Sequence, residues 1–227
     1  MKNNIHAIIL ARGGSKGIKN KNLISIKNKP LVYWSIKHSK SSKLINETWV
    51  SSDDNKILKV SEKYKAKLIR RPKRIATSKS SSESAWIHAI NFLKSQNIKP
   101  THIVGIQPTS PIRSSKDFDD AIKHFMSKRF DSMFTSAVIN DHFIWKKNKS
   151  KNLIANYNYK NRKPRQLIED KFLENGSFYI FKTEKFLKFK CRLFGKIGTY
   201  EMSKIKSFQI DDMQDLNIMK ALAIKYL

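Results

Sequence analysis

Short apolar runs alternate with amphipathic segments along most of this 227-residue chain, and this alternation limits the folds open to it. Short continuous apolar runs predict buried strands. These runs are 5–10, 48–50, 67–69, 102–106, 132–138 and 177–181, with further candidates at 200–202 and 207–210.

Apolar residues at helical spacing follow most of these runs. The helical segments are 31–38, 54–64, 83–93, 118–126 and 213–226. Pro30 suits the start of the first, and Ser80 and Glu83 have the spacing of a capping box before the third. Strand–helix alternation of this kind predicts an α/β fold of three layers, with helices on both faces of a mostly parallel, Rossmann-like sheet.

The alternation breaks over 139–172, a polar stretch with several aromatic residues. It reads as an insertion rather than a further strand–helix unit. At roughly 100–200 residues per domain, the chain predicts one domain, 1–227, that carries this insertion.

Composition excludes several classes of protein. The one cysteine, Cys191, rules out an internal disulfide framework and a cysteine-rich zinc cluster. No apolar stretch approaches the roughly 18 residues of a membrane span, and the start of the chain lacks the layout of a signal peptide. We therefore expect a cytoplasmic protein with no membrane partner.

The chain carries 46 Lys and Arg against 18 Asp and Glu, a formal net charge of +28. Such a charge suits a nucleic acid, a polyanionic small substrate, or a lysine-rich solvated surface with no partner. The basic residues are spread along the whole chain, and no nucleic-acid recognition motif is present. Nucleic-acid binding is therefore the remote alternative, and we expect no such partner.

Polar residues follow each predicted strand of the sheet. They occupy 12–16, 52–53, 70–72, 107–110 and 211–212. Ligands of open parallel sheets bind at the carboxyl ends of the strands, so these segments are expected to converge on one cleft.

The segment after the first strand is a basic glycine loop, Arg12-Gly13-Gly14-Ser15-Lys16-Gly17. Glycines let backbone N–H groups approach phosphate oxygens, and the cations add charge. The spacing is neither that of a P-loop nor that of the dinucleotide fingerprint. A phosphate site and a plain strand–helix turn are both compatible with the loop taken alone.

A specific resemblance emerges once this loop is read with the segments that follow the later strands. The combined motifs are 10–17, 19–22, 51–53, 71–72, 76–77, 81–83, 107–113, 164–166, 174–179 and 210–212 with Asp215. In order and spacing they resemble the acylneuraminate cytidylyltransferases (the CMP-sialic acid synthetases) over about residues 5–225.

The resemblance implies a reaction in which the anomeric hydroxyl of a nonulosonic acid attacks the α-phosphate of CTP, with Mg²⁺ assisting. It implies catalytic roles for Arg12, Lys21 and Asp211, with Asp211 also the metal ligand. The residues implied in nucleotide binding are Ala11, Arg12, Gly14, Lys16, Lys21, Asn22, Arg71 and Ser82. Those implied in sugar binding are Gln107, Arg165 and Tyr179.

The family's counterpart of 139–172 is a dimerisation element, so the resemblance implies a homodimer through this insertion. Its aromatic residues would then anchor the interface, and a plain surface flap is the alternative. These residues are Phe143, Trp145, Tyr157 and Tyr159.

Several roles stay open at this point. Ser82 also suits a helix cap, Tyr179 a core aromatic, and Arg113 a structural ion pair. Gln209 stands where many members have a carboxylate, which leaves the number of metals open and raises the possibility of an inactive relative. The sugar also stays open, with legionaminate or a 3-deoxy-octulosonate as alternatives.

Overall fold

A seven-stranded sheet forms the centre of the molecule in the computed structural model, which describes residues 3–139 and 143–227 and all their side chains except that of Arg165. Its strand order is β11-β7-β10-β6-β1-β4-β5. The strands are β1 (Ile5–Leu10), β4 (Glu47–Ser52), β5 (Lys67–Arg70), β6 (His102–Ile106), β7 (Ser132–Ile139), β10 (Lys171–Lys182) and β11 (Ile197–Glu201).

Most strand pairings are parallel, as the alternating pattern predicts. β1 pairs in parallel with β4 and β6, β4 with β5, and β11 with β7. β10 is the exception and runs antiparallel to both β6 and β7. Its carboxyl-terminal half, the run predicted as a strand at 177–181, completes the middle of the sheet.

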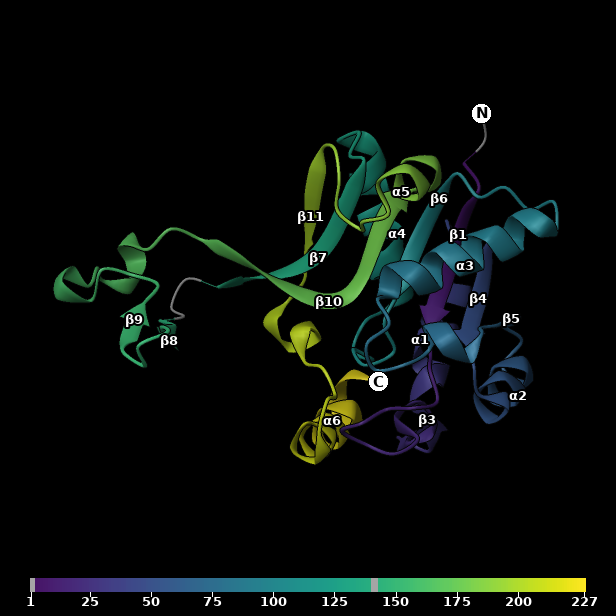
Figure 1. Ribbon diagram of the computed structural model, residues 1–227, viewed down its shortest axis with the longest axis horizontal. Coiled ribbons are helices and arrows are strands. Elements are labelled where there is room, and N and C mark those ends of the chain that lie inside the picture. The colour runs from purple at the N-terminus through teal and green to yellow at the C-terminus, as the bar shows by residue number, and fades with distance from the viewer. Residues whose placement is uncertain (1–2, 140–142) are drawn as a thin grey trace.

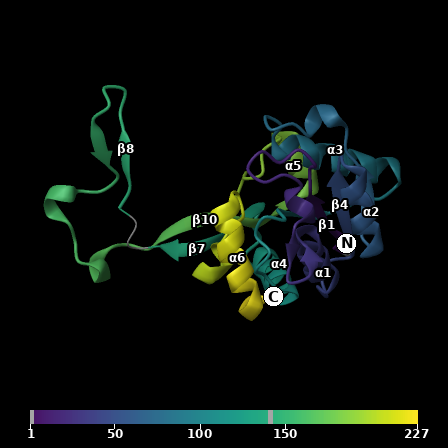
Figure 2. The ribbon, with the colours of Figure 1, turned by 90° about the horizontal axis from the view of Figure 1, so that it is seen from below.

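Helices cover both faces of the sheet and give the three predicted layers (Figures 1 and 2). They are α1 (Leu31–Lys40), α2 (Asn55–Lys63), α3 (Ser82–Ser95), α4 (Ser115–Ser127), α5 (Thr183–Phe189) and α6 (Met213–Tyr226). Within the described residues, none is long and apolar enough to cross a bilayer.

Alternate residues of β1 face opposite layers, because successive strand side chains point to opposite sides. Ile5, Ala7 and Ile9 pack in the cluster that holds residues of α1, α2 and α4, whereas Ile8 packs in the cluster of α3 and α5. Full burial of each large apolar side chain contributes about 1.5–3 kcal/mol. The alternation therefore fixes which helices lie on which face.

A third cluster lies beside the sheet rather than on it. It joins α6 to α1 and to the hairpin of β2 (Ser25–Ile26) and β3 (Lys29–Pro30), through Ile26, Trp34, Ile210 and Met219. The segment that precedes α6 is thereby held against the loops at the carboxyl ends of the strands.

Of the two further candidate strands near the C-terminus, one was displaced by a few residues and the other was wrong. The last strand of the sheet is 197–201 rather than 200–202, and 207–210 is not a strand. Residues 204–207 form a 3₁₀ helix, and the Ile210 N–H bonds to the Thr109 carbonyl outside the sheet. The apolar residues of 207–210 are explained by another contact, since Phe208 and Ile210 pack in the third cluster.

The 143–170 segment projects away from the sheet between β7 and β10 (Figures 1 and 2). It contains a small hairpin of β8 (Trp145–Lys147) and β9 (Leu153–Ala155), followed by two short 3₁₀ helices at Tyr159–Asn161 and Arg165–Leu167. Its position agrees with an insertion; residues 140–142, also part of that prediction, lie outside the described residues.

Candidate functional site

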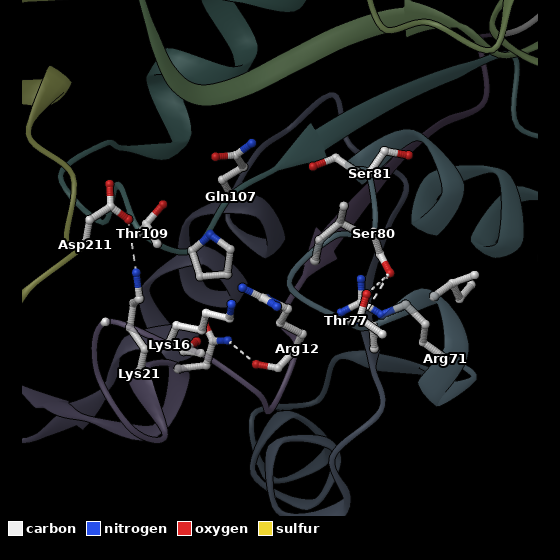
Figure 3. Close-up of a pocket in the computed structure, with 18 of the residues that line it drawn as sticks. Arg12, Lys16, Lys21, Arg71, Thr77, Ser80, Ser81, Gln107, Thr109 and Asp211 are labelled. Carbon is white, nitrogen blue, oxygen red and sulfur yellow. Dashed lines mark hydrogen bonds and ion pairs between the residues drawn. The ribbon is translucent and has the colours of Figure 1, made fainter.

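A cavity of about 500 Å³ opens at the carboxyl ends of the central strands (Figure 3). It is lined from the glycine loop, the segment after β5, the start of α3, the segment after β6 and the segment before α6. The lining residues that carry polar or charged side chains are Arg12, Ser15, Lys16, Lys21, Asn22, Arg71, Thr77, Ser80, Ser81, Ser82, Gln107, Thr109, Gln209 and Asp211. Four of the five predicted polar segments therefore converge on one cleft, whereas 52–53 contributes no residue to the described lining.

Two hydrogen bonds hold the glycine loop, one to the segment after β4 and one to the 3₁₀ helix at Lys21–Leu23. The Gly13 N–H donates to Asp53 Oδ1 at 3.0 Å, and Asn22 Nδ2 donates to the Arg12 carbonyl at 2.9 Å. The side chain of Arg12 is left free to face the cavity, where its Nη1 is buried with no hydrogen-bond partner among the described residues. Asp53 thus holds the loop rather than lining the cleft.

Arg71 faces the cavity from the side opposite Lys21 and is only 5% exposed. Its Nε and Nη2 find no partner among the described residues. Burial lowers the pKa of Arg71 to about 10, although the nearby Asp53 carboxylate opposes the shift. A buried cation with free donors costs stability unless an anion completes it, so Arg71 marks an anion site.

Hydroxyl groups form the wall at the start of α3. Ser81 is the N-cap of this helix and accepts a hydrogen bond from the Ser84 N–H at 3.1 Å. The predicted capping box at Ser80 was therefore wrong by one residue, and Ser82 begins the helix rather than capping it. Glu83 does not reach back to the cap, because its carboxylate binds Arg192 Nε at 2.6 Å.

Lys21 and Asp211 meet at the opposite end of the cavity (Figure 3). Lys21 Nζ lies 3.1 Å from Asp211 Oδ1 and donates to the Ile210 carbonyl at 2.7 Å. The neighbouring carboxylates have structural roles: Asp212 and Asp215 form a capping box at the start of α6. Gln209 donates from Nε2 to the Asn175 carbonyl at 2.8 Å.

Three of the predicted site residues do not line the cavity. Ala11 is fully buried and Gly14 is exposed, and neither is among the described lining residues. Tyr179 is 3% exposed, its hydroxyl donates to Glu174, and its ring packs edge-on against Trp86. Burial, together with that carboxylate, raises the pKa of Tyr179 to about 12. Tyr179 is therefore a core aromatic in this structure.

Arg165 begins a 3₁₀ helix in the projecting segment, and its side chain lies outside the described residues. The remaining predicted residues all line the cavity. They are Arg12, Lys16, Lys21, Asn22, Arg71, Ser82, Gln107 and Asp211.

Arg113 is a positioning residue rather than an ion-pair partner. It is fully buried and donates to the Ser177 carbonyl, the Ser177 hydroxyl, the Ser35 hydroxyl and the Gln107 carbonyl. Burial lowers its pKa to about 9. These bonds fix the backbone on which the Gln107 side chain is carried into the cavity.

Sequence reasoning gave no role to several other lining residues. Thr77, Ser81 and Thr109 lie inside the motifs that carry the resemblance, so the signal was present. Ser80 was read only as a helix cap, and it binds Thr77 Oγ1 at 2.9 Å. The amide of Gln209 was noted only as a missing carboxylate.

The donor set fits Mg²⁺ only in part. Asp211 is the single carboxylate among the described lining residues, and those residues contain no group of three His, Cys, Asp or Glu that could hold a metal. Mg²⁺ is often bound through one or two carboxylates plus substrate phosphates and water. The residues present therefore fit an ion that is held mainly by a bound phosphate ligand.

The fold and the cavity together define a three-layered α/β protein, in which four cations of the described lining face a cleft at the carboxyl ends of parallel strands, an arrangement suited to an anionic ligand. The cytidylyltransferase family model matches residues 6–225. The chain belongs to this family.

Two relatives of the chain support the same assignment. The chain is 34% identical over 211 residues to N-acylneuraminate cytidylyltransferase A of Danio rerio, covering 91% of this chain and 48% of that protein. It is 30% identical over 220 residues to pseudaminic acid cytidylyltransferase of Campylobacter jejuni, covering 95% and 94%. The chain thus spans about half the length of the Danio rerio relative and nearly all of the Campylobacter one.

Solved structures agree on the fold. The structure of CMP:2-keto-3-deoxy-manno-octonic acid synthetase complexed with CTP superposes with a TM-score of 0.74 at 14% identity, covering 99% of this chain and 100% of that one. A 4-diphosphocytidyl-2C-methyl-D-erythritol synthase superposes with a TM-score of 0.70 at 10% identity.

Proposed function

We propose that the chain transfers the cytidylyl group of CTP to the anomeric hydroxyl of a nonulosonic acid. The observation that carries this is the cavity itself, where four cations of the described lining face one carboxylate and two donors of the buried Arg71 have no partner among the described residues. Membership of the cytidylyltransferase family supports CTP as the nucleotide. Relatives named for N-acylneuraminate and pseudaminic acid support an acidic nine-carbon sugar as the acceptor.

In the proposed reaction the sugar hydroxyl oxygen forms a bond to the α-phosphorus, and the bond from that phosphorus to the β-phosphate oxygen breaks. Pyrophosphate leaves, and the hydroxyl proton is lost. Phosphoryl transfer of this kind depends mainly on positioning and on neutralising the phosphoryl oxygens. Arg12 and Lys21 serve the triphosphate and the leaving pyrophosphate, and Lys16 assists from the loop.

The remaining lining residues divide between nucleotide and sugar. Arg71, Asn22 and Ser82 bind the nucleotide, and Gln107 contacts the sugar acid. Arg165 keeps its proposed role as a partner for the sugar carboxylate, because a guanidinium forms bidentate bonds with a carboxylate. Asp211 holds Mg²⁺, which supplies positive charge to the phosphoryl oxygens when bound.

We also propose a homodimer through 139–172 and a cytoplasmic location. The support for the dimer is the unusual number of large apolar side chains exposed on the described part of the insertion, since such a surface typically binds another protein. They are Ile144, Trp145, Leu153, Ile154, Tyr159, Leu167 and Phe172. The exposed free Cys191 is compatible with the reducing cytoplasm.

The experiment is an assay of pyrophosphate release with CTP across N-acetylneuraminic, legionaminic, pseudaminic and 3-deoxy-octulosonic acids. We expect Mg²⁺-dependent release with at least one nonulosonic acid and little with UTP. Asp211→Asn is the negative control, because the metal loses its anionic ligand. Release only with the octulosonate would reassign the acceptor, and no release with any acid would refute the proposal.

A further inference from the structure

The contact between Lys21 and Asp211 joins two groups whose proposed roles require them to be apart. Lys21 is to bind phosphate and Asp211 is to hold a cation, yet the ammonium lies 3.1 Å from the carboxylate. Asp211 is also the one carboxylate among the described lining residues. While Lys21 pairs with its Oδ1, the described lining offers no carboxylate that is without a cationic partner.

The backbone around Asp211 is held in place from three directions. The Asp211 N–H donates to Asp215 Oδ2 at 2.9 Å, and Lys21 holds the preceding carbonyl at 2.7 Å. A Cβ atom at Gly17 would lie 2.1 Å from the Asp211 carbonyl oxygen, so the glycine loop packs directly on this backbone. Any separation of the pair must therefore come from the side chains.

The pair is also built to separate easily. The Asp211 side chain is 74% exposed, and exposed ion pairs are weak because water screens them. The Lys21 side chain is 12% exposed and lines the cavity, so a triphosphate there would present several anionic oxygens to the same ammonium. The lysine stem is flexible enough to exchange one oxygen partner for another.

Gln209 strengthens the dependence on Lys21. Its amide nitrogen is bound to the Asn175 carbonyl, and it lines the cavity as a neutral group beside Asp211. A carboxylate at this position would give the free protein a second anionic ligand. Because position 209 carries an amide instead, Asp211 is the one carboxylate of the described lining that can attract a cation.

From these contacts we infer that Lys21 is a lock on Asp211 that the nucleotide releases. In the free protein the ammonium neutralises the carboxylate, and phosphate oxygens draw it away, so Asp211 binds a divalent cation more readily when nucleotide is present. The inference rests on the proposed function for the identity of the nucleotide. It adds an order of events that follows from this chain's own residues.

The test is isothermal titration calorimetry in EDTA, which measures the binding of CTP and, in a parallel series, of inorganic pyrophosphate. Asp211→Asn should tighten both about two- to fivefold, because the carboxylate no longer competes for the ammonium. In a Lys21→Met background the same change should have less than half this effect. Glu201→Gln, the loss of an exposed carboxylate on β11 outside the lining, controls for long-range charge.

Binding of Mn²⁺ to the protein, measured by the loss of the EPR signal of the free ion, gives a second readout that does not depend on turnover. Nucleotide-free protein should leave the signal of the free ion unchanged, and protein with CTP should deplete it more than CTP does alone. Depletion by nucleotide-free wild type would overturn the lock. So would an Asp211→Asn effect that is equal in the two backgrounds, even if CTP binds and turns over. Coupling seen with pyrophosphate but not with CTP would instead support the lock and contradict CTP as the substrate.

Discussion

Arg71 shows how a single buried side chain can serve binding at the expense of stability. Arg71 is only 5% exposed, and two of its guanidinium nitrogens have no partner among the described residues. Burying an unpaired charge destabilises the folded protein, and the same unpaired donors form strong bonds to an entering anion.

We predict that Arg71→Met weakens CTP binding about tenfold or more, because one buried, charge-assisted contact is worth about 1.5–3 kcal/mol. The melting temperature should stay the same or rise, since the uncompensated charge is gone. Calorimetric titration and thermal denaturation measure the two effects. Arg70→Met is the matched control, because Arg70 is exposed and lies outside the cavity lining; an equal loss of affinity there would point to overall charge instead.

At the scale of the element, the start of α3 connects the stability of a helix with the wall of the cavity. Ser81 caps the helix and also lines the cavity. Ser81→Ala should lower the free energy of unfolding by about 1 kcal/mol, because the Ser84 N–H loses its acceptor. Urea denaturation measures this, and Ser81→Asn should stay close to wild type because asparagine also caps. A full loss with asparagine would show that the cap is not the cause.

Asp131 joins three elements, and its charge makes that junction sensitive to pH. It accepts hydrogen bonds from Lys182 at the end of β10, from Lys185 in α5 and from the Lys196 N–H before β11. These bonds, that of Lys182 foremost, hold the pKa of Asp131 well below its usual range. The junction therefore depends on the ionised carboxylate.

A carboxyl whose pKa is lower in the folded state stabilises the protein above its unfolded pKa of about 3.9, and loses that contribution as the pH falls further. Asp131→Asn should therefore lower stability at pH 7, and the difference from wild type should shrink below about pH 4. Urea denaturation between pH 3 and 7 measures it; these pH limits follow from the same reference value. A difference that stays constant with pH would contradict the assignment.

The sequence patterns predicted elements well where local signals agreed with tertiary packing. Continuous apolar runs located β1 and β6 because both strands are buried on both faces. The same reasoning failed at 207–210, where Phe208 and Ile210 pack with residues of α6. Sequence patterns also missed α5, which follows β10 with no intervening loop. Local pattern cannot distinguish a sheet edge from another apolar neighbour.

The site residues could be predicted where they lie in segments that directly follow the strands of the sheet. The segments around Arg12, Arg71 and Gln107 converge as predicted, because the sheet topology determines it. The sequence left Tyr179 open between a sugar contact and a core aromatic, because its burial depends on Trp86 of α3, a contact with no local signature. The Lys21–Asp211 contact spans 190 positions and has no local signature.

At the scale of the whole molecule, neither the basic residues as a group nor the exposed apolar side chains mark the cavity. Only four of the 46 Lys and Arg residues line the described cavity, so the charge of +28 could not have identified the site by itself. The large apolar side chains exposed on β8 and β9 belong instead to the projecting segment, away from the cavity.

We predict that the protein elutes with twice the chain mass in light scattering coupled to size exclusion, and that Leu153→Glu on β9 gives a monomer. Leu153 is 62% exposed in the single chain, so the substitution should not unfold it, whereas a charge in an apolar interface lacks a partner. Ile224→Glu on α6, at 79% exposed, is the control and should remain a dimer. Loss of the dimer with Ile224→Glu instead would place the interface at α6.

The close approach at Gly17 also limits how this sequence can vary. The glycines at 176 and 195 have positive φ and are needed for their backbone conformation. Gly17 is needed for space, because even one methyl group there would collide with the Asp211 carbonyl. In a saturation library selected for activity, we expect position 17 to retain glycine alone, although its backbone would suit other residues.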